Sequence, residues 1–201
     1  MKDKDPYAMF ENINNARTKK MYTFHNKSAE AYFENSVRER YSKELLKQAE
    51  TDVCGLPYHY GKFTYWIERR ARWNKPKLMA RVDEEAPYVV IDLEDRSESL
   101  DYWYPSPNGE RLVYGISVNG SEETTLHVLD VLALEEIDTP IPFAGFTDQG
   151  DICWLSDSNR FIYPRMNGFS QTGPRDKWLL GTKLYLPTVG DNADQDKMIF
   201  G

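Results

Sequence analysis

The sequence predicts a mainly β chain, a partial β-propeller of two to three blades that follows an N-terminal helical segment. The main observation is a template of basic, apolar, β-branched and tyrosine residues at 62–65, 111–114 and 160–163, with 49 residues between successive copies. Trp103 and Trp154 precede the last two copies, each followed by a turn-forming run. Blades of four strands and about 40–50 residues recur at such a step in β-propellers.

Residues 1–53 are expected to be helical. No proline or glycine occurs from Asn14 to Asn35, and apolar residues recur there at near-helical steps. Ser36 and Glu39 then have the spacing of a capping box, which predicts a second helix to about Glu50. One face of this second helix is expected to carry Val37, Tyr41, Leu45 and Ala49. The lysines and arginines of both helices, interspersed with glutamate, favour a solvated surface over a site for an acidic partner.

Residues 54–201 are expected to form the partial propeller, with blades at about 58–98, 100–150 and 151–201. The Gly55-Leu56-Pro57 run ends the helical segment, and apolar residues then alternate in 63–67, 112–118 and 124–131, as in half-buried strands. A fourth copy of the template would fall beyond residue 201. The chain is therefore expected to stop inside a repeat array.

Composition excludes several classes of partner. The net charge of −7 argues against nucleic acid, because phosphate binding needs a basic face. No apolar run is long enough to span a bilayer, and the first residues do not resemble a signal peptide, so a cytoplasmic location without membrane contact is expected. Cys54 and Cys153 could form one disulfide, but two reduced core thiols are favoured without a secretory signal.

Five segments of the chain carry a resemblance to a known family: 5–11, 25–26, 106–122, 154–163 and 180–200. Asp5-Pro6-Tyr7 opens the first of them, although Met9 and Phe10 depart from the family's Trp and Leu. Residues 106–122 follow a Ser-x-Asp-Gly…Ala-Tyr-x-x-Ser-x-x-Gly-Ser-(Asp/Glu) pattern almost position for position. Together they resemble the N-terminal half of the prolyl oligopeptidase family of serine peptidases, which includes prolyl endopeptidase and oligopeptidase B.

The resemblance implies a fold and a role. The family's seven-bladed propeller caps an α/β-hydrolase domain, on which the N-terminal helices also pack, and it limits access so that only peptides reach the catalytic triad. This chain would then carry two to three blades and no hydrolase domain. The resemblance also implies that the pocket selecting proline or a basic residue lies mainly outside this chain. Such a chain is expected to be inactive alone.

No catalytic, cofactor-binding or metal-binding residue is predicted, and no cofactor. Acyl transfer of this type needs a Gly-x-Ser-x-Gly elbow between a strand and a helix, and the sequences around Ser117 and Ser170 both lack the second glycine. His25, His59 and His127 are interpreted as ordinary core or surface histidines. The acidic run 191–196 lacks the glycine and distal glutamate of a calcium loop, so a solvated turn is expected.

The tryptophans are expected mostly to fill the spaces between blades, where large rings bury much area, although contact with peptide remains open for any that face the channel. These are Trp66, Trp73, Trp103, Trp154 and Trp178.

The alternative to a peptidase propeller is a non-catalytic propeller-like interaction module, whose exposed sheet edges would require oligomerisation or cover.

Overall fold

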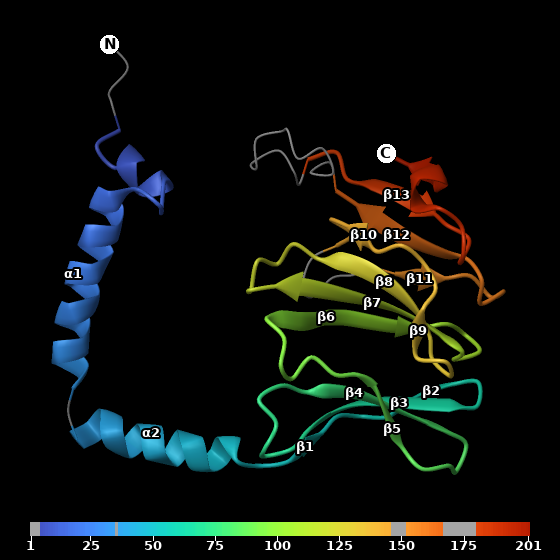
Figure 1. Ribbon diagram of the computed structural model, residues 1–201, viewed down its shortest axis with the longest axis horizontal. Coiled ribbons are helices and arrows are strands. Elements are labelled where there is room, and N and C mark those ends of the chain that lie inside the picture. The colour runs from blue at the N-terminus through green and yellow to red at the C-terminus, as the bar shows by residue number, and fades with distance from the viewer. Residues whose placement is uncertain (1–4, 35, 146–151, 167–179) are drawn as a thin grey trace. The chain divides into compact units, whose positions relative to one another are not determined.

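The computed structural model describes residues 5–34, 36–145, 152–166 and 180–201 (Figure 1). The chain divides into two compact units, Met1–Thr51 and Asp52–Gly201. Across the described ranges, no helix is both long enough and apolar enough to cross a membrane. The sequence-based prediction of a mainly β chain with N-terminal helices is confirmed, since α-helices Ala16–Phe33 and Ser36–Ala49 belong to the first unit and every described strand belongs to the second.

In the helical unit, residues 5–34 and 36–51 form a short 3-10 helix and two α-helices. The 3-10 helix is Ala8–Glu11, α1 is Ala16–Phe33 and α2 is Ser36–Ala49. Asn15 caps α1, because its side chain accepts a hydrogen bond from the backbone N–H of Arg17 at 2.9 Å. The buried Thr18 hydroxyl donates to the Met9 carbonyl at 2.8 Å and so ties α1 to the 3-10 helix.

The described residues of the second unit form three antiparallel sheets. In the first sheet, β1 and β2 both pair with β3, and β4 and β5 follow; the bounds are Val53–Cys54, Tyr58–Tyr60, Phe63–Arg69, Lys77–Val82 and Tyr88–Ile91. In the second sheet, β6, β7 and β8 pair in order, and β9 and β10 both pair with β8; the bounds are Glu98–Pro105, Arg111–Val118, Thr125–Asp130, Glu135–Glu136 and Ile141–Pro142. The third sheet is β11, β12, β13 and β14, with bounds Cys153–Trp154, Phe161–Arg165, Lys183–Leu186 and Lys197–Phe200.

The repeated template occupies the same place in all three sheets. Its copies fall at the start of β3, β7 and β12, the second strand of each meander when β1 and β2 are taken as one interrupted first strand. The tyrosine of each copy is buried, as is the apolar residue two positions before it. The spacing of 49 residues therefore measures the distance between equivalent strands, which explains why the pattern could be read from the sequence.

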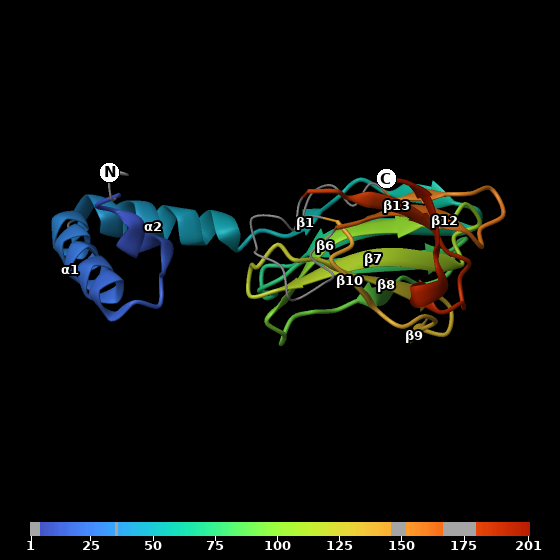
Figure 2. The same cartoon turned by 90° about the horizontal axis from the view of Figure 1, so that it is seen from above.

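The sheets pack face to face (Figure 1), and Figure 2 shows them overlying one another from above. One core cluster joins the first and second sheets and includes Phe63, Tyr65, Leu112 and Tyr114. Another joins the second and third sheets and includes Val113, Val128, Phe161 and Tyr163. Leu112 and Val113 belong to different clusters because adjacent residues of a strand point to opposite faces. The second sheet is therefore covered on both faces.

The expectation of core thiols is wrong for both cysteines. Cys54 and Cys153 are free, but both are exposed. Each lies in a two-residue first strand, β1 or β11, at the edge of its sheet, so the cover that a central strand would have is missing. For these two cysteines, the position of the strand within the sheet sets the exposure, and the apolar character of the side chain does not.

Candidate functional site

The first strands of the three sheets lie side by side. Tyr58 of β2 contacts Trp103 of β6 edge to face, with ring centroids 5.7 Å apart. The indole Nε1 of Trp154 in β11 donates to the backbone carbonyl of Tyr104 in β6 at 2.9 Å. We call the border made by β1, β2, β6 and β11 the first-strand edge. Within the described strands, each of these pairs on one side only, so its other side offers backbone groups to an extended peptide.

The exposed side chains of the first-strand edge are apolar, thiol, hydroxyl or imidazole groups. They are Val53, Cys54, Tyr58, His59, Ser99 and Cys153. Tyr58 is 50% exposed and Val53 51% exposed, so both offer apolar area. Glu98, at the start of β6, is also partly exposed and adds a carboxylate to this edge.

Two tryptophans of this edge lie between sheets, as the sequence predicts. Trp103 packs against Tyr65 of the first sheet, with centroids 6.3 Å apart, as well as against Tyr58. Trp154 packs against Phe161 at 5.0 Å. Outside the edge, Trp66 donates to Glu68 at 3.1 Å and Trp73 lies beneath the Lys77 ammonium at 4.6 Å. Trp178 lies outside the described residues.

Ser117 is held in a buried hydrogen-bonded cluster. Its hydroxyl donates to Asp101 Oδ1 at 2.9 Å, and the Thr124 hydroxyl donates to Asp101 Oδ2 at 2.7 Å. Ser117 is fully buried in β7 and is paired with Ser99 of β6, with no strand-to-helix turn around it. This geometry gives Asp101 two donors and leaves Ser117 closed to a substrate. Ser170, the other serine considered, lies outside the described residues.

The three histidines lie in separate places. His25 is on α1 and contacts Phe24 edge to face. His59 Nδ1 lies 3.0 Å from Thr64 Oγ1, across the β2–β3 hairpin. His127 is directly opposite Tyr114 in the β7–β8 register, which places it on the other face of the sheet from Ser117. Ser117 and His127 therefore do not form a nucleophile–base pair.

His127 belongs to a polar cluster in a groove of about 230 Å³ between the first and second sheets. Glu136 Oε1 lies 2.9 Å from both the Tyr114 hydroxyl and His127 Nδ1, and the Tyr114 and His127 rings stack. Burial raises the pKa of Tyr114 above its usual range, and the neighbouring Glu136 carboxylate adds to this. Tyr114 therefore stays protonated and serves as a hydrogen-bond donor.

The acidic run 191–196 is a solvated turn only in part, because Asp196 is half-buried. Asp196 accepts a hydrogen bond from the Tyr163 hydroxyl at 2.7 Å, and burial raises the pKa of this carboxyl despite that bond. Burial also raises the pKa of Asp138, which accepts from the Gly190 backbone N–H at 2.6 Å. Asn192 caps a short 3-10 helix in the run. Over the described part of the chain, no three His, Cys, Asp or Glu side chains gather as metal ligands do.

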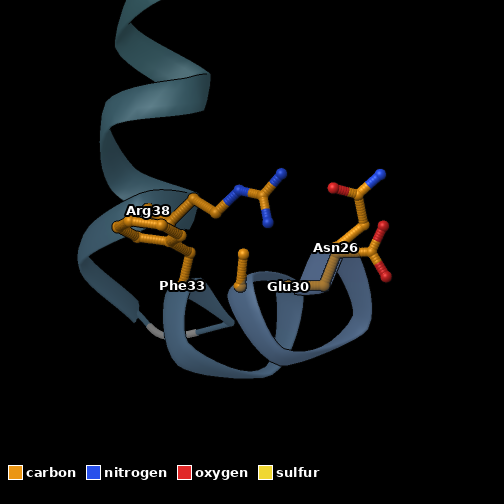
Figure 3. Close-up of a pocket in the computed structure, with 5 residues that line it drawn as sticks. Asn26, Glu30, Phe33 and Arg38 are labelled. Atoms are coloured by element: carbon orange, nitrogen blue, oxygen red, sulfur yellow. The ribbon is translucent and has the colours of Figure 1, made fainter. Parts of the chain in front are cut away.

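The helical unit has a groove of about 490 Å³ where α1 meets α2. Figure 3 shows Asn26, Glu30 and Phe33 projecting from α1 beside Arg38 of α2. The apolar residues expected on one face of α2 are exposed, with Val37 at 54% and Leu45 at 64%. These exposed side chains offer apolar area that a contact with another domain or chain would bury.

The sequence did not predict the two hydrogen-bonded clusters around Asp101 and Glu136. A signal existed for the first, because Asp101 is an acid flanked by Leu100 and Tyr102 in a strand where apolar residues dominate. Its partners could not be found without the β6–β7 register, which contains an irregularity between Leu100 and Tyr102. Glu136 contacts His127 only because β9 folds back along β8.

The family model for the prolyl oligopeptidase N-terminal β-propeller domain matches residues 2–201. The chain belongs to this family. A solved prolyl endopeptidase, from a study of inter-domain dynamics in catalysis and specificity, superposes with a TM-score of 0.83 at 22% identity. Prolyl oligopeptidase B from Galerina marginata, bound to a 35mer hydrolysis and macrocyclization substrate, gives 0.81 at 18%. Oligopeptidase B from Leishmania major gives 0.74 at 14%.

These prolyl oligopeptidase relatives are much longer than this chain. The alignments cover 98% of this chain but 29%, 30% and 28% of the three solved chains, in the same order. The chain thus spans less than a third of their length. The resemblance deduced from residues 5–200 is confirmed at the level of family and fold.

Proposed function

We propose that this chain is the N-terminal propeller portion of a prolyl oligopeptidase-like serine peptidase, and that it gates peptide access to a hydrolase domain outside these 201 residues. The observation that carries this proposal is the first-strand edge. Three successive sheets present their first strands side by side, and further sheets in the same arrangement would enclose a channel lined by these strands. Peptides would reach the hydrolase domain through that channel, whereas folded proteins would be too wide.

Partner contacts follow from the same proposal. The exposed apolar face of α2 and the groove beside Arg38 would pack on the hydrolase domain, because such packing would bury apolar side chains that are exposed among the described residues. The outer strand β14 leaves Met198, Ile199 and Phe200 exposed, which suits contact with another part of the enzyme. The substrate class is peptides. A cytoplasmic location is part of the proposal, and the two free, exposed thiols support a reducing compartment.

The first test is the coding sequence that follows Gly201. It should encode further blades and then a Gly-x-Ser-x-Gly elbow, with the Asp and His of a triad downstream. A stop codon, or a sequence without either feature, would contradict the proposal. The isolated chain should show no turnover of Z-Gly-Pro or dibasic reporter peptides, and Ser117→Ala should leave that result unchanged.

Gating itself can be tested with the cysteines of the first-strand edge. In the enzyme extended through its hydrolase domain, a bulky maleimide on Cys54 and Cys153 should slow cleavage of long peptides more than cleavage of short reporters. The matched control is the Cys54→Ser, Cys153→Ser enzyme under the same treatment. Equal slowing of both substrates, or none, would contradict gating by this edge.

The alternative function is a non-catalytic interaction module. Its exposed sheet edges would require the chain to form a closed oligomer. Size-exclusion chromatography with light scattering separates the alternatives, because a soluble closed oligomer supports the module. A partly unfolded monomer or an aggregate supports the fragment of a larger peptidase.

A further inference from the structure

The β7–β8 hairpin contains an asparagine–glycine pair, Asn119-Gly120, whose exposure leaves it open to a spontaneous covalent change. We infer that Asn119 is a site of deamidation in the folded chain, and that the similar pair Asn108-Gly109 is protected. In this reaction the backbone nitrogen of the glycine attacks the side-chain amide carbon of the preceding asparagine. A C–N bond forms, the side-chain nitrogen leaves as ammonia, and water then opens the cyclic imide to give aspartate or isoaspartate.

Asn119 and Gly120 are free to react in this way. Both are exposed, and no heavy atom of a residue other than 119–121 lies within 4 Å of where a Cβ on Gly120 would stand. Both residues have left-handed backbone angles, with φ 55° and 66°. The turn is closed by the Ser121 N–H donating to the Val118 carbonyl at 3.0 Å. In the described part of the chain, neither the Asn119 side chain nor the Gly120 N–H forms a hydrogen bond. The two reacting groups are therefore not tied to other atoms.

Hydrogen bonds hold both the side-chain amide of Asn108 and the backbone N–H of Gly109. Asn108 Oδ1 accepts from the Ser106 hydroxyl at 2.8 Å and from the Glu110 N–H at 3.1 Å, and its Nδ2 donates to Glu110 Oε2 at 2.8 Å. The Gly109 N–H donates to the Ser106 carbonyl at 2.8 Å. For cyclisation, this turn must first open and lose those bonds together. Opening is rare in a turn packed between two sheets.

The product would change both charge and backbone. Conversion of Asn119 takes the net charge from −7 to −8 and adds a carboxylate beside Glu122 and Glu123. An isoaspartyl linkage also adds one carbon to the main chain of the hairpin. Because the turn geometry depends on left-handed angles at two successive residues, the Val118–Ser121 hydrogen bond would be lost in that form.

The test is incubation of the native chain at mildly alkaline pH, followed by tryptic mapping with tandem mass spectrometry. Trypsin places Asn108 in peptide 97–111 and Asn119 in peptide 112–160, so the two sites are counted separately. Asn119 should convert at least about tenfold faster than Asn108, and in urea the difference should disappear, because it depends on local opening. A protein isoaspartyl methyltransferase should label the aged 112–160 peptide.

A variant gives an independent check. Gly120→Ala places a methyl group next to the attacking nitrogen and should slow conversion at Asn119, while labelling of the other peptides stays the same. The inference is overturned if Asn119 stays intact in the native chain, or if Asn108 converts as fast as Asn119 before urea is added.

Discussion

The indole Nε1 of Trp154 donates to the main-chain carbonyl of Tyr104 at 2.9 Å, from the first strand of the third sheet to the first strand of the second. The two residues are 50 positions apart, almost the repeat length of the array. Further contacts of similar sequence separation join Ser158, in the turn after β11, to Asn108 and to Arg111 at the start of β7. Asn108 N–H donates to Ser158 Oγ at 3.1 Å, and Arg111 Nη1 donates to the Ser158 carbonyl at 3.1 Å.

Trp154→Phe should destabilise the chain by roughly 1 to 3 kcal/mol, because a half-buried carbonyl loses its donor. Urea unfolding monitored by circular dichroism measures this change. Trp66→Phe is the matched control, since Trp66 donates within its own strand to the Glu68 carboxylate. If both substitutions lower the free energy of unfolding by the same amount, the hydrogen bond between the sheets does not stabilise the chain more than the bond within one strand.

Gly109→Ala should cost clearly more than Gly120→Ala. Both glycines have positive φ, 78° and 66°, so each alanine loses about 1 to 2 kcal/mol of backbone energy. A Cβ on Gly109 would also stand 2.4 Å from the Tyr60 carbonyl oxygen of the first sheet, whereas Gly120 has open space. The difference in unfolding free energy between the two variants reports the approach of neighbouring sheets. Equal losses would show that the sheets are not in this contact.

Asp196→Asn should raise the melting temperature at about pH 7 and change it little near pH 4. Burial raises the folded-state pKa of Asp196, so the stability that its protonated form provides is present at acid pH and is lost as pH rises through that raised pKa. Asparagine resembles the protonated acid and can still accept from Tyr163. The control is Asp194→Asn, at an exposed position in the same run. An Asp196→Asn variant that melts below the parent chain at neutral pH would show that the charged carboxylate is the stabilising form.

Both thiols should react in the native chain. Cys54 and Cys153 are exposed, so a chromogenic disulfide reagent should titrate two thiols without denaturant, and each single serine variant should remove one of them. If the thiols react slowly and the reaction accelerates only in urea, the cysteines are buried in the core, as the sequence-based interpretation expected.

Much of the fold was accessible from local sequence. Helix bounds near 16–33 and 36–49 follow from residue periodicity and breakers, and the position of β3, β7 and β12 follows from the repeated template. Each of these signals lies within a short stretch of sequence, so it can be recognised without knowing which strand or helix the stretch packs against. The family resemblance then supplied the long-range arrangement that periodicity cannot contain.

The contacts of the candidate site were not accessible in the same way. Ser117 meets Asp101 only through the β6–β7 register, and Glu136 meets His127 only because β9 turns back on β8. Cys54 and Cys153 were misjudged because exposure depends on whether a neighbouring strand exists. The apolar face of α2 was identified, but its exposure in the helical unit depends on a partner that the sequence does not name.

The sheets are built from consecutive stretches of chain, and each packs on the one made just before it. During synthesis, a completed sheet can therefore dock on its predecessor while the ribosome is still making the next. At every stage the most recently added sheet has one uncovered apolar face. Stalled or shortened products of this gene should accordingly depend on chaperones that hold such a face until the following sheet arrives.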